Sequence, residues 1–451
     1  MASKRTLSML IFLLRWFLSY FDLTALVSCS ATTTAPTIPS TTSTTDPINT
    51  TMHLTALLGL CASTASAINL YVSDYAGNVT TLEFLQESSG NYSLKPTYVN
   101  PGCAPNPSWL TLDSHSRLLF CANEGLSSAN GSLTTFTINS NGSLTSLSNT
   151  TTLSGPVSAV VYGDTHDKAI ALAHYSGSAV SSYLLRDSKP AFSHQFPFTL
   201  PHPGVDPERQ DAPHAHEVLT DPTGQYLLSP DLGSDLIHVF AINPESLALT
   251  PCKSIPATPG SGPRHGVFYN PTGFPNAGGK TYFYLVEELS GHISSYEVSY
   301  LPNQGGLSFT GPLQSENATW LFNVPGRNAP AEIEISPDNR FLIVSNRNST
   351  AFTLPTIGDS DSISTWALDP KTGAFNFLQL WPSSGAFPRH FSISKTGQFV
   401  AVGLQSIQTV AILQRDVATG LIGEPVARVE VSGNVTAVVW DDEWTGMGWV
   451  G

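Results

Sequence analysis

Apolar and polar positions along most of the chain repeat one pattern. A short apolar stretch leads into a turn such as Asp-Pro-Thr-Gly or Ser-Pro-Asp-Asn, and a second apolar stretch, a polar loop and a third, alternating stretch follow. Alternation with a period of two and short apolar runs are typical of half-buried and sandwiched β-strands. The clearest copy is HEVLTDPTGQYLLSPDLGSDLIHVFAIN, at residues 216–243.

The copies recur often enough to predict a ring of sheets. Their first strands begin near residues 109, 159, 217, 266, 332 and 391, at intervals of 49 to 66 residues. Each interval leaves room for a four-stranded antiparallel sheet and its loops. Repetition at such a period is typical of a β-propeller.

Both ends of this region supply part of one more sheet. Residues 68–98 hold about three strands without a first one, and VTAVVWDDEW from Val435 is a first strand without followers. Pairing the two would close the ring and cover both sheet edges. We therefore predict an all-β fold, one seven-bladed β-propeller over residues 68–451. Six blades or two β-sandwiches are the alternatives, and both leave the two half-blades unexplained.

Composition and charge narrow the function classes. Only 12% of the 451 residues are charged, and 35 Gly and 33 Pro suit a chain with many turns. Lys and Arg number 20 against 34 Asp and Glu, so the net charge is −14. A chain this acidic, without a basic run beyond its N-terminus, is a poor partner for nucleic acid or an anionic membrane. No P-loop, dinucleotide fingerprint or Cys-x-x-Cys occurs, so we expect no cofactor.

Residues 1–67 do not follow the repeat and are predicted to lie outside the fold. An apolar run at residues 7–27 precedes a Ser/Thr/Pro-rich tract, and a second apolar segment at residues 52–67 ends in Ala-Ser-Ala, as signal peptidase requires. Two interpretations stay open. The start lies at Met52, and residues 52–67 are a signal peptide, or it lies at Met1, and residues 7–27 are a signal or anchor. Both predict a secreted protein, with attachment to a cell wall or membrane through this segment as an option.

Two further features agree with an oxidising compartment. Of five cysteines, Cys29 and Cys61 lie before the repeats, whereas Cys103 and Cys121 flank one strand and its return and could form a local disulfide. Cys252 would then be a free, buried thiol. Eight Asn-x-Ser/Thr sequons favour a glycoprotein, namely Asn78, Asn91, Asn130, Asn141, Asn149, Asn317, Asn348 and Asn434.

Polar residues are predicted to converge on one mouth of the propeller. The start of the first strand and the end of the second strand of each blade lie at the same face near the axis. Starts of first strands carry His214, His216, Arg264, His265, Glu332, Arg389 and His390, and ends of second strands carry Glu124, Asp231, Glu287, Glu288, Arg347 and Gln405. Arg and His at equivalent points in three copies favour a functional site. The alternative is a polar channel lined by ion pairs. Two His separated by one residue, even with Glu287 as a third ligand, form no known cage, so we expect no metal.

Several phrases resemble those of a known family. HAHEVLTDPTGQYLLSPDLGSDLIHVF, PGSGPRHGVFYNPTG, AEIEISPDNRFLIVSNR and PRHFSISKTGQFVAVGLQ are similar, in this order, to the seven-bladed lactonase family. That family includes bacterial-type 6-phosphogluconolactonase and the eukaryotic carboxy-cis,cis-muconate cyclase. The resemblance covers about residues 68–445 and implies a seven-bladed propeller without a cofactor. It also implies a catalytic set of His216, Arg264, Glu287 and Arg347, while His265 beside Arg264 is closer to the lactonase branch.

Two reactions at this mouth stay open. In lactone hydrolysis, Glu287 or His216 would activate a water, and Arg264 and Arg347 would hold a carboxylate or phosphate and stabilise the oxyanion. In cyclisation, the two arginines would bind the carboxylates of a muconate while His216 or Glu287 delivers a proton. The other mouth residues, His214, His265, Glu332, Arg389 and His390, are predicted to bind the substrate.

A non-enzyme hypothesis stands beside these reactions. A secreted, sequon-rich propeller could be a surface or cell-wall glycoprotein that binds a partner with its propeller face and has little or no catalysis. In either case a monomer is expected, because a closed propeller has no free edge strand to pair.

Overall fold

A computed structural model describes residues 67–272, 279–322, 324–325 and 327–442. Residues 1–66 lie outside the described residues, and so does nearly all of the predicted leader and Ser/Thr-rich segment. The described chain is built almost entirely of β-strands, with two short 3-10 turns, η1 (Pro302–Gln304) and η2 (Gln405–Ile407). It contains no helix long and apolar enough to cross a membrane.

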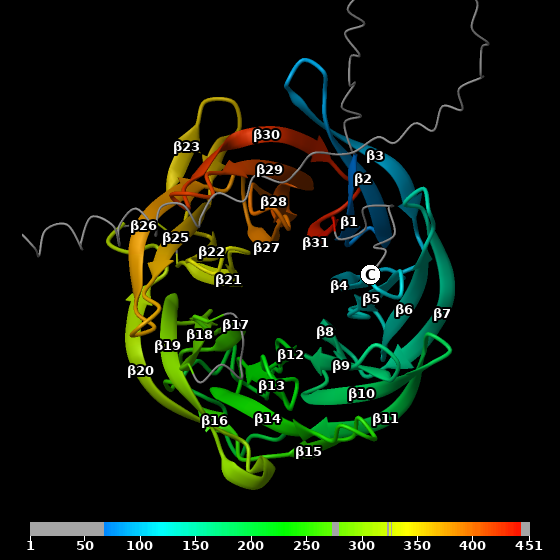
Figure 1. The fold of residues 1–451 in the computed structure, drawn as a ribbon, viewed down its shortest axis with the longest axis vertical. Helices are drawn as coiled ribbons and strands as arrows, with labels where there is room; N and C mark the ends of the chain where they lie inside the picture. The colour runs from blue at the N-terminus through cyan, green and yellow to red at the C-terminus, as the bar shows by residue number, and fades with distance from the viewer. Residues whose placement is uncertain (1–66, 273–278, 323, 326, 443–451) are drawn as a thin grey trace, which may run out of the picture. The chain divides into compact units, whose positions relative to one another are not determined.

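The strands form seven sheets arranged around a common axis, as Figure 1 shows. From the innermost to the outermost strand, the sheets are β31 (Val435–Asp441), β1 (Ile68–Asp74), β2 (Asn78–Gln86) and β3 (Tyr92–Asn100); β4 (Pro107–Asp113), β5 (Leu118–Asn123), β6 (Gly131–Ile138) and β7 (Leu144–Thr152); β8 (Pro156–Gly163), β9 (Lys168–His174), β10 (Ala179–Arg186) and β11 (Lys189–Pro197); β12 (Leu219–Thr220), β13 (Tyr226–Asp231) and β14 (Leu236–Ile242), with β15 (Leu249–Pro251) and β16 (Ile255–Pro256) outside it; β17 (Pro263–Tyr269), β18 (Thr281–Glu287), β19 (His292–Tyr300) and β20 (Leu307–Asn317); β21 (Ala329–Ile335), β22 (Phe341–Arg347), β25 (Ser362–Leu368) and β26 (Phe375–Pro382); and β27 (Pro388–Ile393), β28 (Phe399–Leu404), β29 (Thr409–Arg415) and β30 (Ile422–Glu430). A small hairpin, β23 (Phe352–Leu354) and β24 (Gly358–Ser360), leaves the sixth of these sheets. The predicted seven-bladed propeller is confirmed.

The ring closes between strands from opposite ends of the described chain. β31 pairs antiparallel with β1, with Asn69 opposite Asp441, as the two predicted half-blades require. Two neighbours hold the end of β31 in place. The guanidinium of Arg117 donates to both oxygens of Asp441, at 2.6 and 2.9 Å, and the hydroxyl of Tyr71 donates to the same carboxylate at 3.1 Å. The seventh sheet is therefore fixed by contacts between residues more than 300 positions apart.

Each sheet buries apolar residues against the sheets on both sides. β18 reads TYFYLVE and is buried along its whole length. Its Tyr284 packs with Leu342 of β22 and Trp366 of β25 in one apolar cluster of the neighbouring sheet. Burying a large apolar side chain contributes about 1.5–3 kcal/mol, so this packing between blades is the main support of the ring.

The fourth sheet departs from the regular pattern at both edges. Its inner strand β12 has only two residues, and the run before it is joined to β13 by one isolated bridge, Ala215 to Asp231. Its outer strand is broken between β15 and β16, and both parts pair with β14. Cys252 lies in this break and is partly exposed. The expectation of a buried thiol was wrong, because no continuous outer strand covers the sulfur.

The other cysteines and the sequons are surface features of the ring. Cys103 and Cys121 form a disulfide, with their Cα atoms 6.0 Å apart. Seven of the eight sequon asparagines are exposed, and Asn78 is partly exposed. Attachment of glycans at these sites stays a prediction.

Candidate functional site

The inner strands carry local irregularities that place large polar side chains at one mouth. β17 and β27 both begin with Pro-Arg-His, and in each the pairing register shifts by one residue between the Pro and the His. Arg264 and Arg389 are therefore bulged residues without a partner in the ladder, and a bulge redirects side chains out of the regular alternation. A shift of the same kind lies in β21 just before Ile333, next to Glu332.

Three guanidiniums share the carboxylate of Glu288, which directly follows β18. Arg209 and Arg347 each place a terminal nitrogen 2.7 Å from it, and Nε of Arg264 lies 3.0 Å away. Burial alone would raise the pKa of Glu288, but the three guanidiniums hold it well below its usual range. Burial and the nearby Arg347 lower the pKa of Arg264 to about 9. We call these four residues the arginine cluster; it keeps an excess of positive charge.

Glu287 does not join this cluster. It is the last residue of β18, and successive side chains of a strand point to opposite faces. Its carboxylate accepts a hydrogen bond from the hydroxyl of Ser290 at 3.3 Å and lines a separate cavity beside Ser290 and His292. Burial raises its pKa. The carboxylate that meets Arg264 and Arg347 is the adjacent one, Glu288.

Three histidines and a glutamate form a second group, the histidine chain. Nδ1 of His216 lies 3.2 Å from Nε2 of His265, and Nδ1 of His265 lies 3.0 Å from Oε1 of Glu332. Oε2 of Glu332 lies 3.5 Å from Nε2 of His390. All four side chains are buried. The chain joins side chains from β17, β21 and β27 with one from the run before β12.

Burial and positive neighbours keep the imidazoles of this chain uncharged. Burial, with Arg264 adding to it, places the pKa of His216 and of His265 well below the ordinary value of 6.5. Burial lowers the pKa of His390 to about 4. Burial also raises the pKa of Glu332, whereas His390 and Arg264 lower it. Neutral imidazoles can accept a proton at pH 7, as a general base must.

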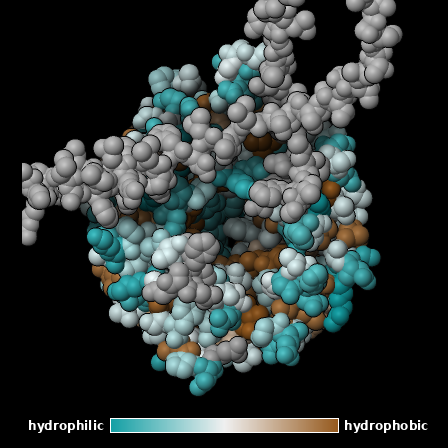
Figure 2. Space-filling model, in the orientation of Figure 1, coloured by the Kyte–Doolittle hydropathy of each residue, from teal (hydrophilic) through white to brown (hydrophobic). Residues whose placement is uncertain are grey.

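The two groups meet at a small cavity on the inner strands. It encloses about 180 Å³ of empty space and is lined by Ser108, Trp109, Val157, His216, Arg264, His265, Arg389, His390 and Thr436. The ring of Trp109 meets His265 and His390 edge to face, at 5.5 and 5.0 Å between centroids. Figure 2 shows that the face turned to the viewer is hollowed near the axis, with hydrophilic residues beside the hollow.

Two other predicted residues have partners of their own. The His214 ring stacks on Tyr175 at 4.2 Å, and its Nε2 lies 3.0 Å from Asp211. Arg389 lies 3.5 Å from Glu124, which also accepts a 2.5 Å hydrogen bond from the hydroxyl of Tyr75. His214 therefore borders the histidine chain without entering it, while Arg389 lines the cavity.

Comparison with known proteins identifies the family. Residues 68–440 match the family described as "Lactonase, 7-bladed beta-propeller". This chain belongs to that family. It is 28% identical over 370 residues to "Probable 6-phosphogluconolactonase" of Arthroderma benhamiae, covering 81% of this chain and 86% of the relative. It is 30% identical over 332 residues to "6-phosphogluconolactonase" of Formosa agariphila, covering 73% and 87%.

A solved structure gives the same picture of this lactonase-family propeller. The periplasmic gluconolactonase PpgL of Pseudomonas aeruginosa superposes with a TM-score of 0.69 at 28% sequence identity, covering 83% of this chain and 99% of that one. Within the described residues, no group of three or more His, Cys, Asp or Glu is arranged to hold a metal ion.

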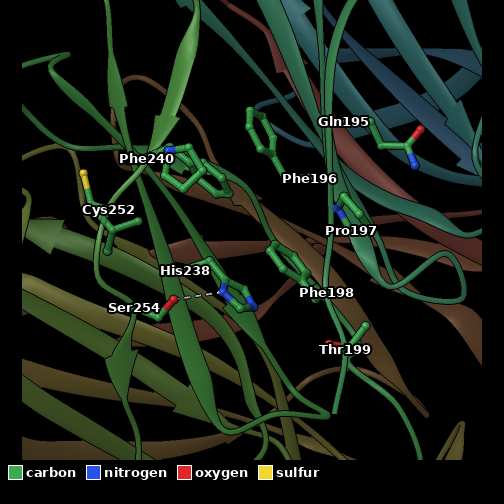
Figure 3. Close-up of a pocket in the computed structure, with 11 residues that line it drawn as sticks. Gln195, Phe196, Pro197, Phe198, Thr199, His238, Phe240, Cys252 and Ser254 are labelled. Carbon is green, nitrogen blue, oxygen red and sulfur yellow. Dashed lines mark hydrogen bonds between the residues drawn. The ribbon is translucent and has the colours of Figure 1, made fainter. Parts of the chain in front are cut away.

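A larger cavity of this lactonase-family chain lies where the outer strand of the fourth sheet is broken. Figure 3 shows it between β11 and the β14–β16 edge, with the aromatic rings of Phe196, Phe198 and Phe240 around it and about 840 Å³ of empty space inside. His238 stacks on Phe198 at 3.6 Å. It also lies between Asp231, at 3.0 Å, and Ser254, at 3.1 Å. Because Asp231 accepts from backbone N–H groups of the turn after β13, we interpret this arrangement as a clasp between strands.

Sequence reasoning missed some residues of the site. Glu288 was placed at the mouth but not chosen, because the alternation of side chains at the strand end depends on the bulge opposite. Arg209 lies in an irregular segment outside the repeat, so no pattern pointed to it. Trp109 is a first-strand residue whose partly apolar setting resembles ordinary packing. For Trp109, a position one residue beyond a Pro-initiated bulge in β4 is the signal that could have found it.

Proposed function

We propose that this chain hydrolyses a lactone that carries a carboxylate or phosphate group, in the cavity between the arginine cluster and the histidine chain. The observation that carries the proposal is the charge of the two walls. Three guanidiniums share one carboxylate on one side, and neutral imidazoles stand on the other. A site with excess guanidinium attracts an anionic substrate, and a neutral imidazole can take a proton from water.

The reaction needs one water and returns every proton. His216 removes a proton from water while the water oxygen bonds to the lactone carbonyl carbon, and the carbonyl oxygen becomes an oxyanion. The ring C–O bond then breaks, the carbonyl re-forms, and the imidazolium of His216 protonates the departing ring oxygen. The product is the open hydroxy acid.

The arginines make this sequence feasible with a weakly basic histidine. Arg264 would stabilise the oxyanion, and preorganised donors of this kind are each worth about 10²–10³ in rate. The same positive charge depresses the pKa of free His216. Once negative charge develops on the substrate beside it, the imidazolium is favoured again, because a nearby opposite charge raises the pKa of a base.

The relatives support this choice of reaction. Two of them are named 6-phosphogluconolactonase or probable 6-phosphogluconolactonase, and the solved neighbour is named a gluconolactonase. All three names denote hydrolysis of the lactone of a sugar acid. For this chain we propose the phosphorylated or otherwise anionic form, because of the arginine excess.

The test is a substrate panel with matched variants of the full chain. Glucono-1,5-lactone, 6-phosphogluconolactone, a carboxymuconolactone and its open muconate would be followed for wild type, His216→Ala and His214→Ala. We expect lactone opening by wild type, a loss of about 10²–10⁴ in kcat for His216→Ala, and less than a threefold change for His214→Ala. Conversion of the muconate alone would replace hydrolysis by cyclisation, and no turnover of any compound would refute the enzyme proposal.

A further inference from the structure

The histidine chain contains more order than a base requires. His216 is the residue that borders the cavity as the proposed base, yet two further imidazoles and a buried carboxylate continue the chain behind it. An imidazole is a base only at the nitrogen that lacks a proton, so the placement of that proton decides whether His216 can act. Backbone groups at the far end of the chain settle this placement.

Two backbone amides fix the direction of the contacts around Glu332. The N–H of Ile333 donates to Oε1 of Glu332 at 3.2 Å, and the N–H of Val438 donates to Nδ1 of His390 at 3.4 Å. A backbone amide nitrogen can only donate. His390 must therefore be unprotonated at Nδ1 and protonated at Nε2, which lies 3.5 Å from Oε2 of Glu332. Both oxygens of Glu332 thus face N–H groups, the pattern that an ionised carboxylate satisfies.

The same pattern extends toward the cavity. With Oε1 of Glu332 as acceptor, the nitrogen 3.0 Å away, Nδ1 of His265, is the donor. The other nitrogen of His265, Nε2, then lacks a proton and accepts from Nδ1 of His216 at 3.2 Å. The proton of neutral His216 is thereby held on Nδ1. Its Nε2 keeps a lone pair, and among the residues that the structure describes it has no hydrogen-bond partner.

We infer that Glu332 is a positioning residue: through His265 it fixes the proton of His216 on Nδ1 and keeps Nε2 of His216 as the basic nitrogen at the cavity. This inference rests on the proposed function for its catalytic meaning. Its structural part, the tautomers of His265 and His216, can be measured without any substrate.

The charged groups around the chain support an ionised Glu332. Arg264 of β17 and Arg389 of β27 line the cavity with the histidines, and Arg347 ends β22. These guanidiniums favour a carboxylate and disfavour an imidazolium, and His390 faces Glu332 from the other side. Trp109, between His265 and His390, brings no charge. The ionised glutamate with neutral histidines is the charge state that these neighbours favour.

Glu334 provides a matched control on the same strand. It lies two residues further along β21, and its Oε2 accepts from the backbone N–H of Ile393 at 3.1 Å. It is also a carboxylate that bridges to β27, yet it has no printed contact with the histidine chain in the described part of the protein. A general loss of stability from removing a carboxylate of β21 would appear equally in Glu334 variants.

The experiment combines a spectroscopic and a kinetic measurement on the full chain. In ¹⁵N-histidine NMR at pH 7, wild type should show His265 and His216 protonated at Nδ1, and Glu332→Leu should lose this fixed pattern. With 6-phosphogluconolactone, kcat should fall about 10- to 100-fold in Glu332→Leu, with KM within about twofold. Glu332→Gln, whose carbonyl can still accept from His265, should recover most of kcat. Glu334→Leu should keep both the NMR pattern and kcat.

The outcomes separate the two proposals. A wild-type spectrum with His265 protonated at Nε2 overturns the inference, whatever the kinetics show. Equal kcat losses in Glu332→Leu and Glu334→Leu overturn it too, because the loss would then be structural. The expected tautomers together with no turnover of the lactone by wild type would overturn the proposed function and with it the catalytic role of Glu332. Should Glu332→Leu fail to fold, Glu332→Gln with the wild-type spectrum still decides the tautomers.

Discussion

Replacing Glu288 by Gln removes one negative charge from among three guanidiniums. Glu288 is 5% exposed and Arg264 is 2% exposed, so neither can turn its charge toward water. Removing one partner of a buried ion pair costs about 3–5 kcal/mol, because the other charge stays buried and unpaired. Arg209 is more exposed and can be rehydrated. We therefore expect the free energy of unfolding at pH 7 to fall by an amount in that range for Glu288→Gln.

The same carboxylate should contribute to the pH dependence of stability. Its pKa in the folded protein is held below its ordinary value of about 4.5. The unfolded chain therefore binds a proton first as the pH falls. The stabilisation by Glu288 is complete above the unfolded pKa and is lost as the pH falls from there through the folded pKa. Glu288→Gln should lack this part of the acid dependence.

The assay is equilibrium urea unfolding, followed by tryptophan fluorescence at pH 7 and at pH 4. Glu287→Gln is the control on the adjacent residue. Because burial raises the pKa of Glu287 and no guanidinium contacts it among the described residues, its replacement should change the unfolding free energy by about 1 kcal/mol or less. Added phosphate should stabilise Glu288→Gln more than wild type, since an anion can replace the lost carboxylate. Equal stability of the two variants at pH 7 would refute the reasoning.

Three further predictions follow from single contacts. The buried His174 has a pKa lowered by burial to about 4, so its protonation on unfolding should destabilise the protein as the pH falls from about 6.5 to 4; His174→Gln should flatten a plot of the unfolding free energy against pH in that window, and an unchanged slope would contradict the assignment. Reduction of the Cys103–Cys121 disulfide, which closes an 18-residue separation, should lower the unfolding free energy by about 3 kcal/mol; a double Cys→Ala variant insensitive to dithiothreitol is the control. Asp441→Asn should weaken ring closure, because it removes the charge that Arg117 contacts; hydrogen exchange should quicken in β1 and β31 but not in β17, and uniform exchange would exclude a local effect.

The sequence predicted the ring more completely than the chemistry. Strand period and turn residues repeat in every copy, so seven sheets and the shared sheet could be predicted from local pattern alone. The choice between Glu287 and Glu288 could not, because a one-residue bulge across the ladder decides which carboxylate faces Arg264. The sequence placed His216, His265, Glu332 and His390 at one mouth, as the structure does, but their order in a chain arises from three inner strands and one irregular run meeting at the axis.

The closure of the ring also sets the order in which the protein can be completed during synthesis. β1 leaves the ribosome near the start of the described chain, and its partner β31 emerges some 360 residues later, since Asn69 pairs with Asp441. Until then β1 has an unpaired inner edge, and such edges invite pairing with other chains. A nascent chain therefore exposes this edge throughout most of its translation. Any truncation before residue 435 leaves that edge open, so incomplete products should be retained by chaperones or aggregate rather than accumulate as partial propellers.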